Sequence, residues 1–185
     1  MGINAERRRA VFLDRDGVIN RAVVRDGRPY PPASAADVEL LPGVAVALRR
    51  LKAAGYLLVV VTNQPDVARG VRSRAEVEAI HARLADALPI DEFRACYHDG
   101  DACTCRKPKP GLILAAAREH HVDLTASVMI GDRWRDIEAG RLAGCLTVFV
   151  ECGYSEPRPD RPDVVVASLE EAAAWILSRE RDRTS

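Results

Sequence analysis

Residues 11–20 read VFLDRDGVIN, and this stretch decides the fold. The apolar run that ends at Leu13 has the length and branching of a buried strand, and Gly17 lets the chain leave that strand sharply. Side chains two residues apart point to the same side of a strand, so we expect Asp14 and Asp16 to converge on one spot. Two carboxylates that close repel each other unless a cation or a shared proton relieves the repulsion, which suggests a phosphate-attacking aspartate with an acid/base partner. A surface turn rich in Asp and Gly is the alternative, and the other segments decide against it.

The composition is that of an ordinary globular domain. Of the 185 residues, 48% are hydrophobic and 29% are charged, so we expect one domain over residues 1–185. Lys plus Arg and Asp plus Glu each number 27 and aromatic residues make up 5%, which argues against a nucleic-acid partner. The basic N-terminus lacks the apolar segment of a signal peptide, and no apolar run reaches transmembrane length. We therefore expect a cytoplasmic monomer with no membrane partner, whose five cysteines form no disulfide framework.

Helical and strand patterns alternate along the chain. Apolar residues recur at helical spacing over 44–54, and an apolar run at 57–61 follows as a buried strand. Ser73 and Glu76 form a capping box ahead of a second helix that is expected to end near Leu88. The other expected elements are helices at 111–120, 134–143 and 168–177 and strands at 93–97, 127–130, 147–150 and 164–166. This alternation predicts an α/β fold: a mostly parallel sheet with helices on both faces and a site at the carboxyl ends of its strands.

Two segments stand outside this alternation. Residues 21–42 contain an Asp-Gly pair and several prolines, so we expect a short hairpin and an ordered loop that can fold over the cleft. Residues 179–185 are expected to form a disordered tail. The intervals between the motifs are too short for a large cap domain. Small loops at 21–42, 65–72 and 96–105 are therefore expected to define specificity.

Polar groups with an affinity for phosphate follow the strand at 57–61. Thr62, Asn63 and Gln64 offer a hydroxyl and amides at the sheet edge where the aspartate pair lies, and such groups can hold phosphate oxygens. Further along, prolines in the loop RKPKPG fix where Lys107 points, and its ammonium would offset the charge of a phosphate. Each signal is weak alone, because polar residues often end strands and loop lysines are usually solvated.

A third carboxylate follows the strand at 127–130. Asp132 alone would suit the N-cap of the next helix. Together with Asp14 and a backbone carbonyl, however, it would give Mg²⁺ the sparse, water-completed oxygen shell that this cation prefers. Asp136 lies one helical turn later. The sequence therefore predicts a magnesium site at the same sheet edge.

This ordered set, Asp-x-Asp, Thr, Lys and a final pair of aspartates, resembles the motifs of the haloacid dehalogenase (HAD) superfamily from residue 11 to about residue 150. The resemblance implies a Rossmann-like HAD fold and phosphate-ester hydrolysis. It implies that Asp14 is the nucleophile and forms an aspartyl-phosphate. Asp16 would protonate the leaving oxygen, later activate water, and bind Mg²⁺ through its backbone carbonyl. Dehalogenase relatives lack the second aspartate, so Asp16 points to phosphate-ester chemistry.

The same resemblance assigns roles to the remaining groups. Thr62 and Lys107 would hold the phosphoryl group, and Asp132 would complete the protein's metal ligands. Asp136 matches the second acidic position of the last motif, whose role varies in the superfamily, so it is held as a supporting residue.

Three cysteines and one histidine lie within ten residues, namely Cys96, His98, Cys103 and Cys105. Three thiolates and one imidazole form a closed tetrahedral set for a structural Zn²⁺. Their spacing differs from that of two-residue zinc knuckles, and separate buried cysteines are the alternative. The HAD subgroup of heptose bisphosphate and histidinol phosphatases carries a similar CxH…CxC zinc loop directly before its Arg-Lys-Pro motif. The resemblance therefore favours a small zinc-stapled loop at 96–105.

The remaining cysteines and three other histidines are expected to have no part in a site. We expect Cys145 and Cys152 to be small buried hydrophobic residues. His81, His120 and His121 fall on helical stretches or at their ends and are expected at the surface.

The motifs look most like those of the heptose 1,7-bisphosphate 7-phosphatases, which implies a small phosphorylated sugar as the substrate. Asn63, Gln64 and Lys107 would contact that substrate. A bisphosphate needs additional cations, and Arg69 and Arg106 are candidates for the remote phosphate. The interval between His98 and Cys103 is short, however, as in the histidinol-phosphatase branch. A histidinol-phosphate phosphatase therefore stays an alternative.

Two further functions are weaker alternatives. A nucleic-acid 3′-phosphatase shares the Asp-x-Asp and Thr-Asn-Gln motifs, but the neutral charge and scarce aromatic residues count against it. A noncatalytic zinc-stapled binding module would leave Asp14, Asp16, Lys107 and Asp132 without a purpose. The turn at Gln64-Pro65-Asp66 departs from the glycine-bearing turn of the heptose enzymes, which keeps the second substrate open.

Overall fold

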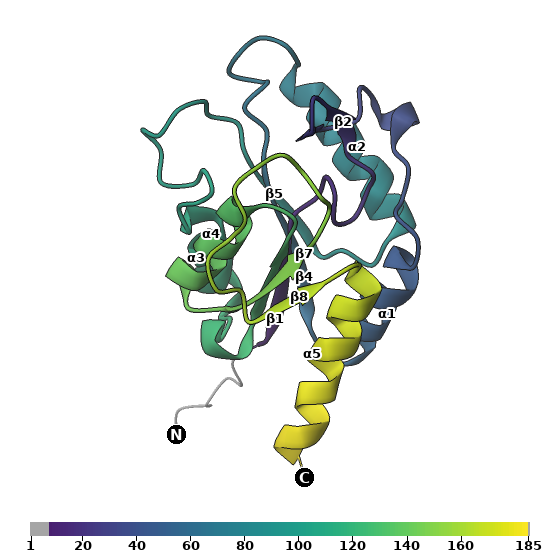
Figure 1. Ribbon diagram of the computed structural model, residues 1–185, viewed down its shortest axis with the longest axis vertical. Coiled ribbons are helices and arrows are strands. Elements are labelled where there is room, and N and C mark those ends of the chain that lie inside the picture. Colours follow the sequence, from purple (N-terminus) through teal and green to yellow (C-terminus); the bar gives the residue numbers. More distant parts are fainter. Residues whose placement is uncertain (1–7, 185) are drawn as a thin grey trace.

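The computed structural model describes residues 8–184. Its main feature is a six-stranded parallel sheet with the strand order β5-β4-β1-β6-β7-β8. The strands are β1 (Ala10–Leu13), β4 (Leu57–Asn63), β5 (Glu92–Cys96), β6 (Val128–Gly131), β7 (Leu146–Val150) and β8 (Val164–Val166). Helices cover both faces of this sheet (Figure 1), so the expected α/β class is confirmed.

Strand β1 lies in the middle of the sheet between β4 and β6. All four of its residues are completely buried, as expected for a parallel strand that is covered on both faces. Leu13 is paired with Val60 of β4 on one side and with Ile130 of β6 on the other, so three chain segments leave the sheet side by side. The later strands add to one side of β1 through β4 and to the other through β6. Such a reversal opens a crevice at the carboxyl ends of the strands.

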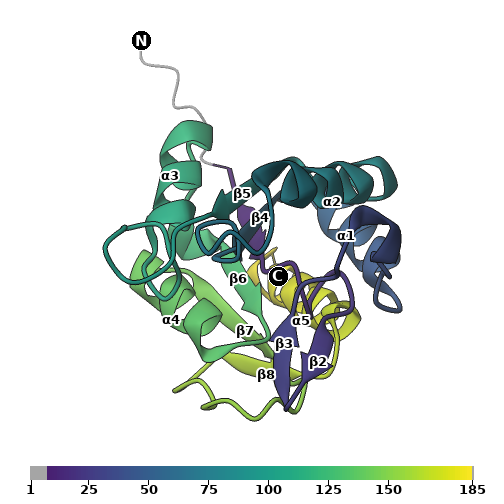
Figure 2. The ribbon, with the colours of Figure 1, turned by 90° about the horizontal axis from the view of Figure 1, so that it is seen from above.

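The helices form two layers around separate buried cores. Leu48, Leu84 and Ile176, from three different helices, belong to the core on one face, whereas Ile113 and Ala139 belong to the core on the other. Figure 2 shows the same division. The first layer contains α1 (Val44–Ala53), α2 (Arg74–Ala87) and α5 (Leu169–Thr184), and the second contains α3 (Gly111–His120) and α4 (Trp134–Ala143). The capping box expected at Ser73 and Glu76 is present at the start of α2, so that prediction is confirmed.

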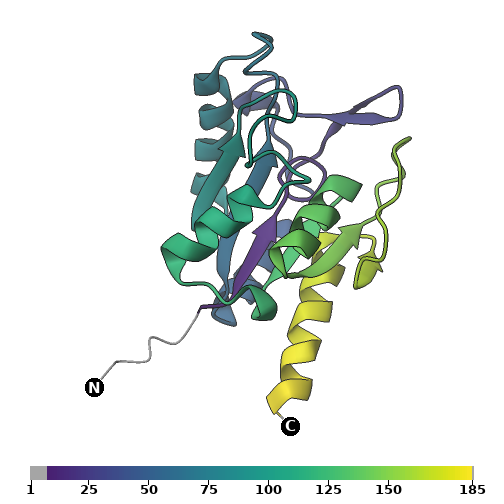
Figure 3. The ribbon, with the colours of Figure 1, turned by 90° about the vertical axis from the view of Figure 1, so that its left-hand side faces the viewer.

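An antiparallel hairpin of β2 (Val23–Arg25) and β3 (Arg28–Tyr30) projects beyond the carboxyl end of the sheet (Figure 3), where a hairpin was expected. Its tip is tied to the loop after β7, because the backbone N–H of Ser155 donates to the carbonyl oxygen of Gly27 at 2.8 Å. A Cβ at Gly27 would lie 2.2 Å from Ser155 Oγ, so this approach requires glycine. Residues 8–184 contain no larger insertion that could act as a cap domain.

The C-terminal helix is longer than the sequence pattern predicts. Helix α5 continues to Thr184, so the prediction of an end at Leu177 is wrong. The extra turns are held by side chains: the Arg179 guanidinium lies 4.9 Å from the centre of the Trp175 ring, and Glu180 pairs with Arg9. Such contacts are not visible in local sequence. Residue 185 lies outside the described residues. No described helix has both the length and the apolar character needed to cross a bilayer.

Two of the smaller predictions are also wrong. His81 is 9% exposed and stacks on Phe93, with 4.8 Å between the ring centres, because α2 turns this position toward β5 rather than toward solvent. Cys152 is exposed because it lies in the loop after β7, whereas Cys145 is buried as expected. His121 is exposed and His120 is partly buried, with its ring 2.8 Å from Glu92.

Candidate active site

A cavity of about 550 Å³ opens at the carboxyl ends of the central strands. Its floor is formed where β1 and β4 end, and its rim includes the β2–β3 hairpin, the start of α4 and the loop after β7. Nine of the residues singled out from the sequence line this cavity, and one of them is Asp136. The other eight have roles suggested by the sequence. They are Asp14, Asp16, Thr62, Asn63, Gln64, Arg69, Arg106 and Lys107.

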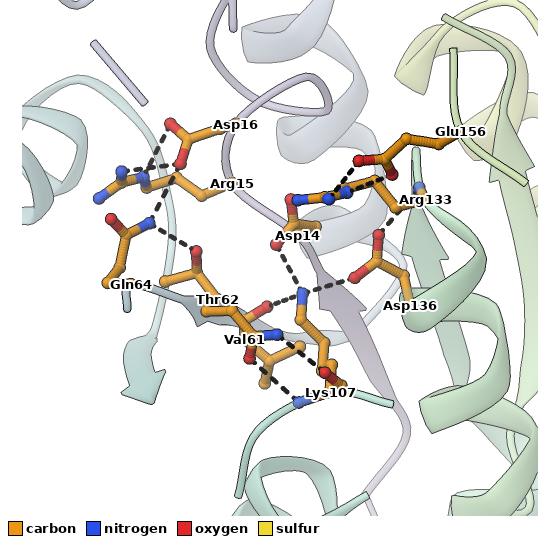
Figure 4. Close-up of polar contacts among 11 residues, drawn as sticks. Asp14, Arg15, Asp16, Val61, Thr62, Gln64, Lys107, Arg133, Asp136 and Glu156 are labelled. Atoms are coloured by element: carbon orange, nitrogen blue, oxygen red, sulfur yellow. Dashed lines mark hydrogen bonds and ion pairs between the residues drawn. The ribbon is translucent and has the colours of Figure 1, made fainter. Parts of the chain in front are cut away.

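Lys107 is the central cation of the floor (Figure 4). Its Nζ lies 2.6 Å from Asp14 Oδ1, 2.6 Å from Asp136 Oδ1 and 2.6 Å from the carbonyl oxygen of Val61. Burial alone would lower the pKa of Lys107, but the charges of Asp136 and Asp14 outweigh it and raise the pKa. The lysine is therefore a permanent ammonium at the place where a phosphate would meet Asp14.

Asn63 fixes the backbone that carries this lysine. Its Oδ1 accepts from the backbone N–H of Lys107 at 3.0 Å, and its Nδ2 donates to the Lys107 carbonyl oxygen at 3.0 Å. The amide thus pairs with both polar groups of a single residue in the following loop. Asn63 thus supports the backbone of Lys107 and also lines the cavity, and its contact with substrate stays a prediction.

Asp14 is the first residue after β1 and is buried beside three charged groups. Burial raises its pKa to about 6, and the repulsion from Asp136 and Asp16 adds to this effect, while the ammonium of Lys107 opposes it. At neutral pH most of this carboxyl group is ionised. A buried, ionised carboxylate with an adjacent ammonium is suited to attack an electrophilic phosphorus.

A cluster of three carboxylates could hold a metal ion, because one oxygen each from Asp14, Asp132 and Asp136 lies within 4.8 Å of the others. Both oxygens of Asp132 are buried and have no close, well-aligned hydrogen bond in the described part of the chain, although the Tyr154 hydroxyl is near. Burial and the charge of Asp14 raise the pKa of Asp132 well above its usual range, although the nearby hydroxyl of Tyr154 opposes the shift. Unpartnered buried oxygens are costly, so this donor set fits a hard divalent cation such as Mg²⁺.

Gly17 makes room for this cluster. Its φ is +96°, and a Cβ at this position would lie 1.9 Å from Asp132 Oδ2. Both the left-handed backbone and the close approach therefore require glycine, which explains physically why the turn after β1 contains it.

Asp136 holds two neighbours at once. One of its oxygens contacts Lys107, and Oδ2 accepts from the backbone N–H of Arg133 at 3.0 Å, which caps the start of α4. Asp132 is therefore not the N-cap of that helix, because Arg133 occupies the N-cap position. The supporting role that the sequence left open for Asp136 is to position the lysine.

Asp16 does not converge with Asp14 at one point, contrary to the expectation from strand geometry. The chain has already turned after β1, so the Asp16 carboxylate points toward Arg15 and Gln64 (Figure 4). Arg15 donates to it through Nε at 3.1 Å and Nη2 at 2.8 Å, Asn20 through Nδ2 at 3.0 Å and Gln64 through Nε2 at 3.1 Å. Burial would raise the pKa of Asp16, but these donors, with the charge of Arg15 the strongest, hold it below its usual range.

The position of Arg15 could not be predicted from the sequence. This arginine is completely buried and forms a bidentate pair with Asp16. Arginines between two aspartates are normally expected in solvent, so only the folded structure reveals this one. Gln64 also donates to Thr62 Oγ1 at 2.9 Å, which links the end of β4 to the second aspartate.

The two arginines proposed for a remote phosphate have different surroundings. Arg69 is held by carboxylates: its Nε and Nη2 lie 2.8 and 2.9 Å from Asp99, and Nη1 lies 3.5 Å from Asp66. Arg106 donates to the neutral carbonyl oxygen of His98 at 3.0 Å and has no ion pair within residues 8–184. Arg106 is therefore the better placed of the two to bind an anion.

The loop at 96–105 gathers its four candidate ligands. One atom each from Cys96, His98, Cys103 and Cys105 lies within 4.8 Å of the others. The Cys96 sulfur lies 3.7 Å from that of Cys103 and 3.2 Å from that of Cys105, and His98 Nδ1 lies 3.3 Å from the Cys105 sulfur. A tetrahedral zinc ion with Zn–S bonds of about 2.3 Å separates its sulfurs by roughly 3.8 Å, so the set fits Zn²⁺ after small adjustments.

This cysteine–histidine loop also makes hydrogen bonds with residues that follow Lys107 in the chain. The backbone N–H of Gly111, at the start of α3, donates to the carbonyl oxygen of Thr104 at 3.1 Å, and a Cβ there would lie 2.2 Å from that oxygen. Lys109 donates to the carbonyl oxygen of Cys103 at 2.9 Å. The cluster therefore determines where the segment carrying Arg106 and Lys107 lies.

Comparison with known proteins agrees with this geometry. Residues 104–172 match a HAD-hydrolase-like family model. A D-glycero-D-manno-heptose-1,7-bisphosphate 7-phosphatase of Thermosynechococcus vestitus is 36% identical over 92% of this chain and 96% of its own length. A D-glycero-beta-D-manno-heptose-1,7-bisphosphate 7-phosphatase of Rhodopseudomonas palustris is 41% identical over 78% of this chain and 84% of its own.

A solved structure has the same fold. The crystal structure of D,D-heptose 1,7-bisphosphate phosphatase from B. bronchiseptica, complexed with magnesium and phosphate, matches with a TM-score of 0.77 at 33% identity, over 92% of this chain and 99% of that chain. The expected superfamily is therefore confirmed, as is the expected class of enzyme, a phosphoric monoester hydrolase. The chain belongs to the HAD superfamily, in the family of the heptose-1,7-bisphosphate 7-phosphatases.

Proposed function

We propose that this protein removes the 7-phosphate from D-glycero-D-manno-heptose 1,7-bisphosphate in a magnesium-dependent reaction with an aspartyl-phosphate intermediate. The observation that carries the proposal is the buried contact of 2.6 Å between Asp14 and Lys107 on the floor of an open cavity. The names of the similar proteins support the choice of substrate.

In the first step, an oxygen of Asp14 attacks phosphorus and the bond to the sugar oxygen breaks. Asp16 gives its proton to the departing sugar oxygen, which leaves as the alcohol. Arg15, Asn20 and Gln64 favour the ionised carboxylate of Asp16 in the arrangement described above, so this donation requires the carboxyl group to leave those partners. The acid step is thereby linked to a rotation of one side chain.

In the second step, the ionised Asp16 takes a proton from water, and the resulting hydroxide attacks the phosphorus of the aspartyl-phosphate. Inorganic phosphate leaves and Asp14 is restored as a carboxylate. Thr62 and Lys107 line the floor and are suited to hold the phosphoryl oxygens, with the ammonium offsetting the charge that develops on them.

Asp14, Asp132 and the backbone carbonyl of Asp16 would hold Mg²⁺, which supplies positive charge against the phosphoryl oxygens when bound. The unpartnered oxygens of Asp132 support this assignment. Zn²⁺ would be held by Cys96, His98, Cys103 and Cys105 and would have a structural role, because the four protein ligands leave no open position.

Histidinol phosphate is the second candidate substrate, favoured by the short interval between His98 and Cys103. Both candidates carry a phosphate on a primary carbon, and they differ in what lies at the other end of the molecule. The rim arginines favour the candidate with a second anion there.

The test is phosphate release from a panel in the presence of Mg²⁺. The panel contains both anomers of the heptose bisphosphate, histidinol phosphate and a 3′-phosphorylated oligonucleotide. We expect the highest kcat/KM for a heptose bisphosphate. A higher value for histidinol phosphate would transfer the proposal to that substrate, and no turnover of any member would refute it.

A further inference from the structure

The rim of the cavity carries more positive charge than the reaction at Asp14 requires. Arg69 is neutralised by Asp99 and Asp66, and Arg133 is neutralised by Glu156, to which it donates through Nε at 2.8 Å. Three arginines of the rim are left without an ion pair within residues 8–184. They are Arg28 on the hairpin, Arg106 beside the cysteine–histidine loop and Arg135 on α4.

Arg135 differs from the other two because one of its buried N–H groups makes no hydrogen bond within residues 8–184. Its Nε is buried and has no hydrogen-bond partner in the described part of the chain. Its guanidinium lies 5.2 Å from the centre of the Trp134 ring, a stacking contact that orients the plane without using its N–H groups. A buried donor without an acceptor is unfavourable, so an acceptor from outside the chain would relieve this cost.

The surroundings of Arg135 are positive. Apart from burial, the strongest influences on its pKa are the charges of Arg133 and Arg106, which lower it, while Glu156 and Asp101 act weakly in the opposite direction. Glu156 is already paired with Arg133. Arg106, Arg133 and Arg135 line the same cavity, and Arg135 has no ion pair with a carboxylate within residues 8–184.

We infer that Arg135, together with Arg106, binds the phosphate of the substrate that is not cleaved. The inference rests on the proposed function, in which this group is the 1-phosphate of the heptose bisphosphate. Guanidinium groups bind phosphate oxygens through two parallel N–H donors, and two of them can neutralise a phosphate dianion. A cavity of about 550 Å³ lies within the range of small-molecule sites, so it can contain the sugar between the two phosphates.

Arg135 is placed to act without taking part in the chemistry. It is adjacent in sequence to Asp136, which contacts Lys107, yet within residues 8–184 it makes no hydrogen bond or ion pair with Asp14, Asp16 or Lys107. Its removal is therefore expected to weaken binding of the remote group and to leave the attack on phosphorus intact.

The test compares two substrates that differ only in the remote phosphate, the heptose 1,7-bisphosphate and the heptose 7-phosphate. Arg135→Ala is expected to raise KM for the bisphosphate about ten- to hundredfold, the range for a lost charge-assisted contact, with kcat nearly unchanged. KM for the monophosphate is expected to change less than about twofold, because that substrate never made the contact. Arg135→Lys is expected to recover part of the loss, since a point charge remains.

Three further variants complete the experiment. Arg141→Ala is the matched control, because Arg141 lies on the same helix, outside the cavity lining, and within residues 8–184 its ion pair is with Glu138. The double variant with Arg106→Ala tests whether both arginines bind one group, in which case the two losses are not additive. Arg135→Gln keeps a polar side chain of similar reach beside Trp134 and replaces Arg135→Ala if alanine lowers the melting temperature.

The outcomes separate the inference from the proposed function. A wild-type enzyme that prefers the bisphosphate, with a variant that keeps this preference, overturns the inference alone. Equal losses on both substrates also overturn it, because Arg135 would then serve the transferred phosphate or the fold. A wild-type enzyme that hydrolyses neither heptose ester overturns the proposed function, and the inference falls with it.

Discussion

Replacing Asp136 by asparagine tests the claim that this residue positions Lys107. Asp136 Oδ1 and Asp14 Oδ1 each lie 2.6 Å from Lys107 Nζ, and all three side chains are buried. Leaving a buried charge without its partner costs about 3–5 kcal/mol. Lys107 keeps Asp14 and the Val61 carbonyl oxygen, so we expect a smaller loss of unfolding free energy, about 2 kcal/mol.

The activity is expected to fall as well. With one carboxylate removed, Asp14 is the one carboxylate left beside the ammonium, which then competes more strongly for the oxygen that must attack phosphorus. We expect kcat/KM to fall at least about tenfold, since loss of one aligned donor to a developing charge typically costs about 10²–10³ in rate. The asparagine amide still accepts from the backbone N–H of Arg133, so the start of α4 is retained.

Chemical denaturation measures the first quantity and phosphate release measures the second. A loss of 2 kcal/mol corresponds to a fall in melting temperature of roughly 4–8 °C for a chain of this size. Glu138→Gln is the matched control, because Glu138 lies on the same helix and its exposed pair with Arg141 is worth less than about 1 kcal/mol. An Asp136→Asn protein with the stability and kcat/KM of the wild type would refute the assigned role.

Three further predictions follow from individual side chains. Asp14→Asn is expected to abolish turnover while the circular dichroism spectrum stays that of the wild type, because the amide has nearly the same volume but is no nucleophile; substantial activity in a folded variant would contradict the mechanism. Protein purified without added zinc is expected to contain about one Zn²⁺ per chain, and Cys103→Ala is expected to lose both metal and thermal stability; a variant that keeps both would make the cluster a coincidence. Burial lowers the pKa of His81 from 6.5 to about 4, so the unfolded chain takes up its proton first as the pH falls. The wild type is therefore expected to lose about 3 kcal/mol of stability between pH 6.5 and 4 relative to His81→Phe; parallel pH curves would show that this titration is not coupled to folding.

The strand ends and the loop that carry the site residues could be predicted from sequence, because they depend on local patterns. Buried strands followed by polar residues predicted that Asp14 and Thr62 lie at one edge of the sheet, and register brings the ends of β1, β4 and β6 together. The four zinc-ligand candidates lie close together in sequence, so a single loop can gather them. The order of these groups along the chain resembles that of a known superfamily, and this resemblance suggested the role of each residue.

The orientation of the side chains could not be predicted, because it depends on residues distant in sequence. The pair of Asp16 with the buried Arg15 and Gln64 requires the turn after β1 to meet the end of β4. The neutralisation of Arg69 by Asp99 depends on how the cysteine–histidine loop is folded. The lack of a hydrogen-bond partner for Arg135 Nε depends on the position of the start of α4 beside the cavity.

The tie between Gly27 and Ser155 bears on the conformational entropy of binding. The hairpin is joined to the loop after β7, and Glu156 in that loop pairs with Arg133 at the start of α4. These three segments form one continuous wall of the cavity before any ligand arrives. Ordering a free loop residue costs about 1–2 kcal/mol, so a wall that is already ordered leaves more of the interaction energy for affinity. Arg106 and Lys107, which follow the cysteine–histidine cluster in sequence, line another part of the cavity. Removing a metal bound by that cluster is therefore expected to loosen this part of the lining and to leave the wall beside the hairpin ordered.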